Sequence, residues 1–255
     1  MNNQTNTQNT RYYRAHVSSF NTNVIQLKNP WVPAWWSAAF PGMGQLMLGS
    51  YVKGFILFTW EFLINVNAKI NLAMVYSFTG HFELAKEVID TRWVLLYISV
   101  YIASIWDSYR ETVDINKVYV LANKEKSQIV PYNLSSMAMN FLDKRQPLLS
   151  LVWSLLMPGM GHLYIRRLPT GFFLLLCWII CTYFSNFLPS LHYTLLGDLS
   201  AAAEILDPQW ALFLPSLYGF SFYEAYTLAV EYNKLYKIEQ SEYLKREYQT
   251  FDLHI

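Results

Sequence analysis

The chain has 255 residues, of which 53% are hydrophobic and 17% aromatic, while only 15% are charged. Soluble domains usually carry about 25% charged residues, so this charged fraction is low. The apolar residues form long runs that are broken by short charged loops, which indicates a protein that crosses a membrane several times. The formal net charge of +1 gives no electrostatic support for nucleic-acid binding. We therefore predict the lipid bilayer as a partner and no nucleic acid.

Cysteine and histidine usage predicts neither a metal site nor a cofactor. Cys177 and Cys181 are the only cysteines and lie in one apolar run, which excludes a disulfide framework. The five histidines are scattered without the spacing of metal ligands. We predict no metal and no cofactor.

The polar start of the chain, MNNQTNTQNT, is typical of a disordered tail. It lacks the basic and then apolar regions of a secretory signal peptide, and 12–20 is a candidate for lying on the membrane surface. We divide the chain into a polar N-terminal tail (1–28), membrane unit 1 (29–119), a cytosolic linker (120–145), membrane unit 2 (146–236) and a cytosolic C-terminal helix and tail (237–255).

The two membrane units are a tandem duplication. The sequence PGMG begins at Pro41 and again at Pro158, 117 residues later, and this offset aligns the two units without a gap. The matched pairs include Trp36 and Trp153, Gly54 and Gly171, Asp90 and Asp207, Trp93 and Trp210, Asp107 and Glu224, and Asn116 and Asn233. Matches of so many uncommon residue types identify an internal repeat.

Each unit begins with an apolar segment of about ten residues, half the length of about 20 that a spanning helix needs. The segment ends at PGMG, where proline and glycine interrupt a helix. We predict that the chain turns back there as a re-entrant hairpin, whose freed backbone groups must be satisfied by protein or water. The turn residues are Pro41, Gly42, Gly44, Gln45, Pro158, Gly159, Gly161 and His162.

Two longer apolar segments follow in each unit, at 54–76 and 93–106 in the first and at 171–193 and 210–226 in the second. Tyrosine and tryptophan at their ends fit the aromatic belts of membrane helices. The predicted fold is an all-α integral membrane protein of two pseudo-symmetric parallel units, each a re-entrant hairpin plus two transmembrane helices. We expect the last helix to continue into the cytosol and to pack on 115–121.

The distribution of lysine and arginine distinguishes two topologies. If three segments per unit crossed, the units would be inverted, as in many transporters. If the first segment turns back, the basic loops lie in the cytoplasm and the acidic connectors, whose only basic residues are Lys86 and Arg92, lie outside. We predict this second arrangement, in a bacterial plasma membrane, with both termini cytoplasmic.

One apolar segment contains a polar stripe. Glu61, Asn65 and Lys69 follow one another at a spacing of four residues, and ionisable residues inside a membrane are costly and often functional. A polar path is one interpretation, and a contact within the helix bundle is the other. The second unit has Trp178 and Thr182 in place of the first two, so the stripe is not shared by both units.

Asp107 and Glu224 form a repeat-matched pair of carboxylates at the cytoplasmic ends of the last spans. General acid–base catalysis also needs a nucleophile or a metal within reach, and the sequence indicates neither. We therefore expect no enzyme, and each carboxylate to accept hydrogen bonds from the backbone N–H groups of its own glycine turn. Gln45 and His162 share one repeat position and are predicted to support the turn. PGMG lacks the spacing of a nucleotide-binding loop.

The first unit resembles the small two-transmembrane-domain family at Gly42, Gly44, Gln45, Gly49, Gly54, Trp106 and Asp107. The second resembles it at Gly159, Gly161, His162, Tyr164, Arg166, Gly171 and Glu224. Met47, Leu168–Pro169 and the glutamate at 224 depart from the family pattern, and both units have longer connectors. The first stretch is also similar to the N-terminal segment of some bacterial maltose-type ABC permeases, although their cytoplasmic coupling-loop sequence is not evident.

This resemblance implies a membrane module and not an enzyme. The function we expect is a non-enzymatic multi-pass subunit that scaffolds or accompanies a larger membrane complex, for example an ABC-type transporter, through protein partners. The alternative is a small transporter or channel with its path at the interface of the two repeats.

Overall fold

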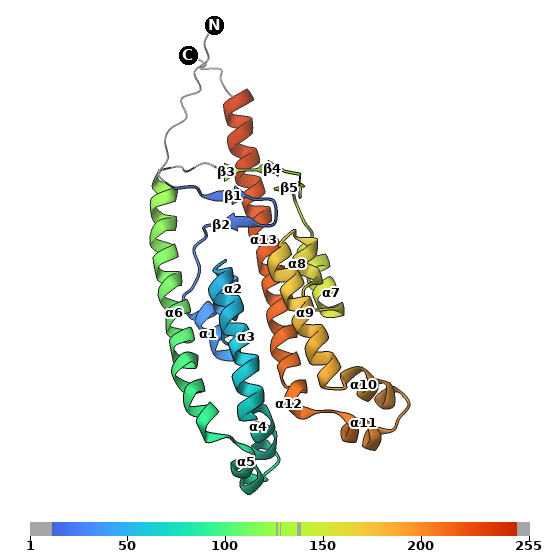
Figure 1. The fold of residues 1–255 in the computed structure, drawn as a ribbon. Coiled ribbons are helices and arrows are strands. Elements are labelled where there is room, and N and C mark those ends of the chain that lie inside the picture. Colours follow the sequence, from blue (N-terminus) through green and yellow to red (C-terminus); the bar gives the residue numbers. More distant parts are fainter. Residues whose placement is uncertain (1–11, 126, 128, 137–138, 249–255) are drawn as a thin grey trace, which may run out of the picture.

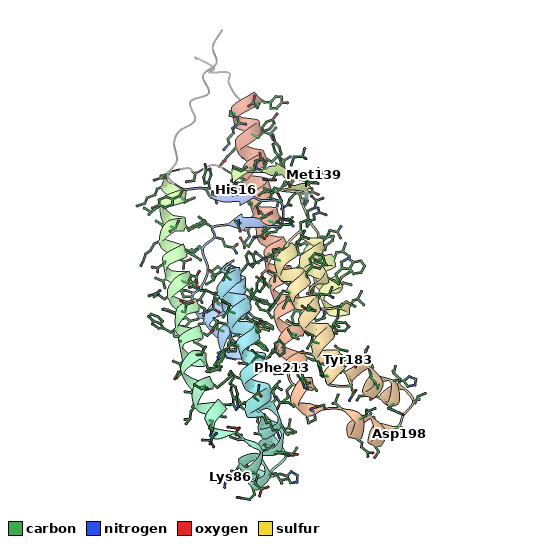
Figure 2. The ribbon with its side chains drawn as sticks, in the orientation of Figure 1. His16, Lys86, Met139, Tyr183, Asp198 and Phe213 are labelled. Carbon is green, nitrogen blue, oxygen red and sulfur yellow. The ribbon has the colours of Figure 1, made fainter. Side chains whose placement is uncertain are left out.

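The computed structural model describes residues 12–125, 127, 129–136 and 139–248. Within these ranges the molecule is elongated and mostly helical, with short strands gathered near one end (Figure 1). The prediction of a helical fold is confirmed. His16 and Met139 lie at the strand end, and Lys86 and Asp198 lie at the opposite end (Figure 2).

The helices of the two units follow the same order. Unit 1 contains α1 (Trp31–Ala39), α2 (Met43–Met47), α3 (Tyr51–Ala68), α4 (Ile70–Phe78), α5 (Phe82–Val88) and α6 (Thr91–Lys124). Unit 2 contains α7 (Pro147–Leu156), α8 (Met160–Tyr164), α9 (Leu168–Phe184), α10 (Phe187–Leu195), α11 (Leu199–Ile205), α12 (Pro208–Ala211) and α13 (Phe213–Tyr248). The 117-residue offset carries α2 onto α8 and α3 onto α9, so the helices of the two units recur at the same spacing as the matched residues.

The predicted helix break at PGMG is present in both units. Helix α1 ends at Ala39, Gly42 has a φ of 97°, and α2 then begins and packs against α1. Gly159 has the same φ of 97° before α8. Such backbone angles favour glycine, which has no Cβ to meet the neighbouring chain. Each unit therefore begins with a short helical hairpin followed by longer helices.

The second apolar segment of each unit is divided in two, and the prediction of uninterrupted helices over 54–76 and 171–193 is wrong. Lys69, with a φ of 56°, separates α3 from α4, and Asn186, with a φ of 54°, precedes α10. A left-handed residue ends an α-helix because the next peptide no longer points along its axis. The acidic connectors form the helices α5 and α11, and Asp90 and Asp207 cap the helices that follow.

The last helix of each unit extends well beyond its predicted apolar segment. Helices α6 and α13 contain 34 and 36 residues, which correspond to about 50 Å each at a rise of about 1.5 Å per residue. Helix α6 therefore passes the expected unit boundary at 119. Helix α13 confirms the expected continuous C-terminal helix as far as Tyr248, beyond which the chain lies outside the described residues.

A helix that crosses a bilayer must be both long and apolar. Within the described ranges no single helix is both long and apolar enough to cross one. Two bent helix pairs meet the requirement together, α5 with α6 at an angle of 89° and α9 with α10 at an angle of 64°.

The polar tail and the linker contain strands that were not predicted. Strands β1 (Ala15–Val17), β2 (Thr22–Val24) and β3 (Ile129–Val130) form one sheet in the order β2-β1-β3, and β4 (Tyr132–Leu134) pairs with β5 (Met139–Phe141). Residues 1–11, which belong to the predicted disordered tail, lie outside the described residues.

Strands β1 and β2 pack on the outer part of α13. Ala15 and Val17 are buried in a cluster with Leu228 and Tyr232, and the Tyr232 hydroxyl donates to the Thr22 carbonyl at 3.1 Å. The prediction that 12–20 lies on a membrane surface stays a prediction. The hairpin of β1 and β2 covers the surface of α13 that was expected to contact 115–121, so that expectation is wrong. The physical reason is tertiary packing, because the apolar residues of β1 alternate with His16 and face the helix.

The two units meet through aromatic side chains. Trp36 on α1 packs against Phe220 and Tyr223 on α13, each with ring centroids 5.4 Å apart, and Phe40 packs against Phe213 at 5.8 Å. Trp153, the repeat counterpart of Trp36, remains 39% exposed. The pseudo-symmetry therefore relates the folds of the two units, while their contact surfaces come from different faces.

Candidate functional site

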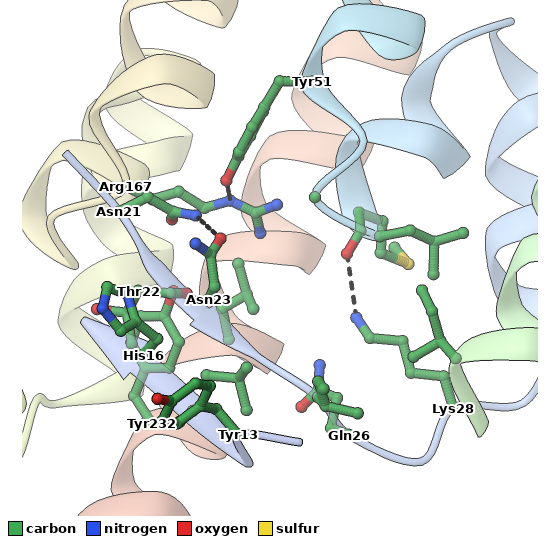
Figure 3. A pocket seen from close by; sticks show the side chains of 18 of the residues that line it. Tyr13, His16, Asn21, Thr22, Asn23, Gln26, Lys28, Tyr51, Arg167 and Tyr232 are labelled. Atoms are coloured by element: carbon green, nitrogen blue, oxygen red, sulfur yellow. Dashed lines mark hydrogen bonds between the residues drawn. The ribbon is translucent and has the colours of Figure 1, made fainter. Parts of the chain in front are cut away.

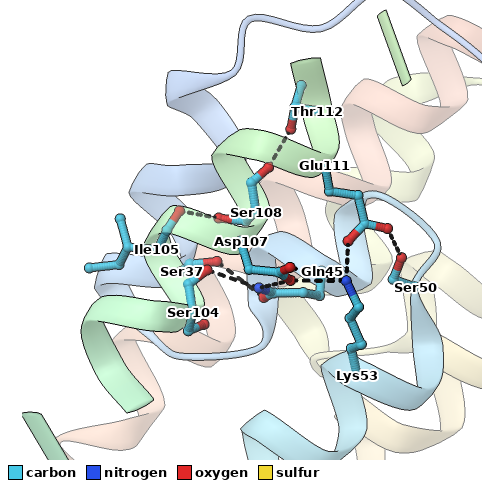
Figure 4. Close-up of polar contacts among 10 residues, drawn as sticks. All are labelled: Ser37, Gln45, Ser50, Lys53, Ser104, Ile105, Asp107, Ser108, Glu111 and Thr112. Atoms are coloured by element: carbon cyan, nitrogen blue, oxygen red, sulfur yellow. Dashed lines mark hydrogen bonds and ion pairs between the residues drawn. The ribbon is translucent and has the colours of Figure 1, made fainter. Parts of the chain in front are cut away.

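Each matched carboxylate lies at the centre of a polar cluster beside its own hairpin. In unit 1 the fully buried Gln45 joins α1, α2 and α6 (Figure 4). Ser37 Oγ donates to Gln45 Oε1 at 3.2 Å, and Gln45 Nε2 donates to the Ser104 carbonyl at 2.9 Å and to Asp107 Oδ2 at 3.3 Å. Gln45 thus fixes the hairpin to the long helix α6.

A lysine supplies the counter-charge of Asp107. Lys53 Nζ lies 3.1 Å from both carboxylate oxygens of Asp107 and 3.1 Å from Glu111 Oε2, and Ser50 also donates to Glu111. The Lys53 side chain is 51% exposed and that of Asp107 is 23% exposed. Ion pairs with this degree of solvent contact contribute little, typically about 0–1 kcal/mol.

The cluster of unit 2 is buried and charged. Glu224 Oε2 lies 3.1 Å from His162 Nε2, and Arg167 Nη1 donates to Glu224 Oε1 at 2.7 Å. The side chains of the three residues are at most 4% exposed. The other ring nitrogen of His162, Nδ1, is buried without a hydrogen-bond partner in the described structure. The pair of Arg167 and Glu224 is therefore held in a low-dielectric environment, where losing one partner is costly.

Arg167 also connects the two units. Its Nε donates to the Tyr51 hydroxyl at 3.1 Å, and its Nη2 donates to the Leu46 carbonyl at the end of the first hairpin. Glu224 therefore holds its own hairpin through His162 and reaches the hairpin of the other unit through Arg167.

The expectation that the carboxylates accept from the glycine amides is wrong in its detail. Asp107 and Glu224 reach their hairpins through the side chains of Gln45 and His162, and the Gly159 amide donates instead to Ser221 Oγ at 2.9 Å. The structural reason is position along α13. Ser221 lies almost one helical turn before Glu224, where it faces the PGMG segment directly.

A matched pair of asparagines forms a second repeated contact. The 117-residue offset aligns these asparagines, but the sequence did not predict their contacts. The Asn116 side chain bonds both the amide (3.0 Å) and the carbonyl (2.8 Å) of Lys28. Asn233 does the same for Arg145, at 2.8 Å and 2.7 Å. Each pair ties the segment before the short helical hairpin to the long helix of its unit, α6 or α13.

The predicted polar stripe is only partly assembled. Asn65 Nδ2 donates to Glu61 Oε1 at 2.9 Å, but Lys69 is exposed at the left-handed break after α3 and does not join them. Asn71 and Gln209 complete the network instead, since Asn65 donates to Asn71 at 3.1 Å and Gln209 donates to Asn65 Oδ1 at 3.0 Å. The network joins the units near the end opposite the strands, which favours the interpretation as a contact within the bundle.

A cavity of about 500 Å³ lies next to Arg167, between β1, β2, the turn after α2, and α13 (Figure 3). Its polar lining includes His16, Asn21, Asn23, Lys28, Tyr51 and Arg167. Lys28 Nζ donates to the Met47 carbonyl at 3.3 Å. Burial lowers the pKa of Lys28 to about 8, with Arg167 adding to this shift and Glu224 and Glu231 opposing it.

The described residues contain no group of three histidine, cysteine, aspartate or glutamate side chains arranged to hold a metal ion. No family model matches the chain, and no curated protein or solved structure is significantly similar to it.

Proposed function

We propose that the chain is a multi-pass protein of a bacterial plasma membrane that serves as a non-enzymatic subunit of a larger membrane complex. The observation that carries this proposal is the separation of its surface into an apolar zone and a basic end. The exposed residues of the apolar zone include Leu95, Ile98, Ile102, Leu148, Leu155, Phe172, Leu176 and Ile179. Lipid is the environment in which such a surface is stable.

The basic residues support one orientation of the proposed membrane protein. Among the described lysines and arginines, all but Lys69, Lys86 and Arg92 lie on segments towards the strand end. Basic residues in short loops favour the cytoplasm. The strand end is therefore the proposed cytoplasmic side, and α5 and α11 are on the outside.

A scaffold is favoured over a transporter by the contents of the interface between the units. Phe40, Phe58 and Phe213 are buried there, and the rings of Phe40 and Phe58 lie 4.1 Å apart. The polar atoms of Asn65 and Gln209 are bonded to one another and do not line a described cavity. A path for a polar solute would require these side chains to separate.

The proposed partner surface is the hairpin of β4 and β5 at the strand end. Tyr132, Leu134 and Met139 are all exposed there, and Leu134 is 75% exposed. Apolar side chains grouped outside the lipid-facing zone are typical of protein–protein contacts. A partner that covers them is the simplest explanation of their exposure.

The proposed topology predicts that both acidic connectors are accessible from outside the cell. Cysteines introduced at the exposed positions Glu87 and Glu204 are expected to react with a membrane-impermeant maleimide in intact cells. Lys124→Cys, at the strand end, is the control and should react only after permeabilisation. If only one of the two connector cysteines reacts in intact cells, the units are inverted and the parallel arrangement is wrong.

The scaffold role predicts a stoichiometric partner that depends on the β4–β5 hairpin. Gentle affinity purification of the wild type, followed by mass spectrometry, should recover one or more membrane or membrane-associated proteins in fixed ratio. Leu134→Glu should reduce this recovery at least fivefold, because a charge would then be buried in the contact. Val120→Glu, an exposed apolar position on α6, is the matched control. Equal recovery with both variants would exclude this surface, and solute uptake by the purified protein alone in liposomes would favour the transporter.

A further inference from the structure

The cavity next to Arg167 is lined by cationic side chains and by no carboxylate from the described residues. Lys28 makes no ion pair with any described carboxylate. Its ammonium donates to the Met47 carbonyl at 3.3 Å. When the Gln26 amide is oriented with its oxygen towards Lys28, Gln26 Oε1 accepts a second hydrogen bond from the ammonium at 2.9 Å. These are neutral acceptors. Glu224 and Glu231 act on Lys28 without a direct contact, and Glu231 bonds the Gln26 amide nitrogen at 3.2 Å instead. A partly buried charge whose direct partners are neutral is stabilised further by an anion in contact with it.

The second cation of the cavity is Arg167. Its bonds to Glu224, Tyr51 and the Leu46 carbonyl use three of its five N–H donors. Arg167 and Lys28 both line the cavity, and Arg167 repels the Lys28 ammonium, while Glu224 and Glu231 oppose the resulting fall in the pKa of Lys28. An anion between them would relieve that repulsion, while Glu224 is already held by Arg167 and His162.

A neutral acceptor lies in the same cavity. Asn21 is 6% exposed, its Nδ2 donates to Asn23 Oδ1 at 2.7 Å, and its Oδ1 is buried without a partner among the described residues. A buried acceptor without a donor costs about 1–3 kcal/mol. A ligand hydroxyl next to the anionic group would supply that donor.

We propose that this cavity binds a phosphate-bearing ligand, with Lys28 and Arg167 contacting the phosphate and Asn21 accepting a hydrogen bond from a neighbouring hydroxyl. A phosphate group offers several acceptor oxygens, which suits an ammonium and a guanidinium together. The volume of about 500 Å³ lies within the usual range for small-molecule sites.

The phosphate can belong to a soluble phosphate ester or to the headgroup of a lipid. A recess that shares Lys28 with the cavity also contains Val32, Tyr223 and the carboxylate of Glu231. An apolar groove that contains Trp35 and Ile105 shares Val32 and Tyr223 with this recess. An acyl chain would fit such a groove. Both sources present the same phosphate chemistry to Lys28, and two probes separate them.

The test uses the purified full chain in detergent, free of phosphate. Binding of glycerol 3-phosphate and of dihexanoyl phosphatidylglycerol, below its micelle concentration, is measured by the shift in Tm at constant ionic strength. At least one probe is expected to raise Tm saturably. Lys28→Met should weaken that binding at least tenfold, whereas Lys237→Met, which removes an exposed lysine of α13, should leave it unchanged.

A second measurement avoids dependence on the stability of the variant. In the wild type, acylation of Lys28 by an N-hydroxysuccinimide ester is followed by peptide mass spectrometry, with Lys237 as the internal control. Either probe should protect Lys28 selectively, and the probe that does so identifies the soluble or the lipid source. If neither probe raises Tm or protects Lys28, or if Lys28→Met binds as tightly as the wild type, the proposal is wrong. None of these outcomes depends on a protein partner.

Discussion

Replacing Glu224 with glutamine is expected to lower the free energy of unfolding by about 3–5 kcal/mol, because it leaves the guanidinium of Arg167 buried without its counter-charge. Glu224 is 1% exposed and lies 2.7 Å from Arg167 Nη1. Glutamine keeps the size of the side chain, so the change tests charge and not packing. The measurements are thermal unfolding in detergent and the yield of monodisperse protein.

The matched control is the same chemical change in the other unit. Asp107→Asn alters the repeat counterpart of Glu224, but the Asp107 pair with Lys53 is in contact with solvent. Its expected cost is about 1 kcal/mol or less. Similar losses in the two variants would show that burial of the Arg167 pair does not determine its contribution.

A double substitution tests whether Arg167 and Glu224 act as a pair. Arg167→Met together with Glu224→Met removes both charges, so it should destabilise the protein less than the sum of the two single methionine changes. The double variant still loses the bonds from Arg167 to Tyr51 and Leu46. We therefore do not expect it to reach wild-type stability. Strict additivity would mean that the two residues contribute independently.

The cluster also shows what the repeat alignment can and cannot predict. The alignment pairs Asp107 with Glu224 and Gln45 with His162, and the structure uses both pairs in equivalent places. It does not pair the cations. Arg167 aligns with Ser50, and Lys53 aligns with Thr170, so each unit neutralises its carboxylate from a different position. Only the three-dimensional contacts reveal that Lys53 and Arg167 both neutralise the matched carboxylate of their unit.

The spacing of polar residues along one helix also predicted only part of the network around Glu61. The spacing of Glu61, Asn65 and Lys69 predicts one helical face only if the helix continues, and the left-handed backbone at Lys69 ends it. Gln209, which replaces Lys69 in the network, lies in the other unit. A long-range contact of this kind leaves no trace in the spacing of nearby residues.

The strands were missed because each contains only two or three residues, too few to show an alternating pattern. Ala15–Val17 contains only two apolar residues, and its strand depends on pairing with β2 and on packing against α13. Isolated strand pairs are marginally stable in water, so tertiary contact decides whether they form. In contrast, the PGMG turn and the Asp90 cap depend on local backbone chemistry, and their repetition could be read from the sequence.

Gly42→Ala is expected to destabilise the protein by about 3 kcal/mol or more, since it combines backbone strain with a steric clash. Gly42 has a φ of 97°, and a Cβ added there would lie 2.5 Å from the Gly54 carbonyl and 2.8 Å from the Phe58 amide nitrogen. Both atoms belong to the backbone of α3, so relief requires α2 and α3 to move apart. The clash would therefore loosen the hairpin where it packs against α3.

Gly80→Ala separates the two contributions. Gly80 has a φ of 82° but open space around the position of an added Cβ, so only the strain of about 1–2 kcal/mol is expected. Gly159→Ala should resemble Gly42→Ala, because its Cβ would meet the Gly171 carbonyl and the Leu175 amide in the same way. Thermal unfolding of the three variants in one detergent gives the comparison. If Gly42→Ala and Gly80→Ala lower Tm equally, close contact between the turn and α3 is not what requires glycine in PGMG. If Gly42→Ala and Gly159→Ala behave alike and Gly80→Ala is mild, the glycine of each PGMG turn is required by the close packing of the turn against α3 or α9.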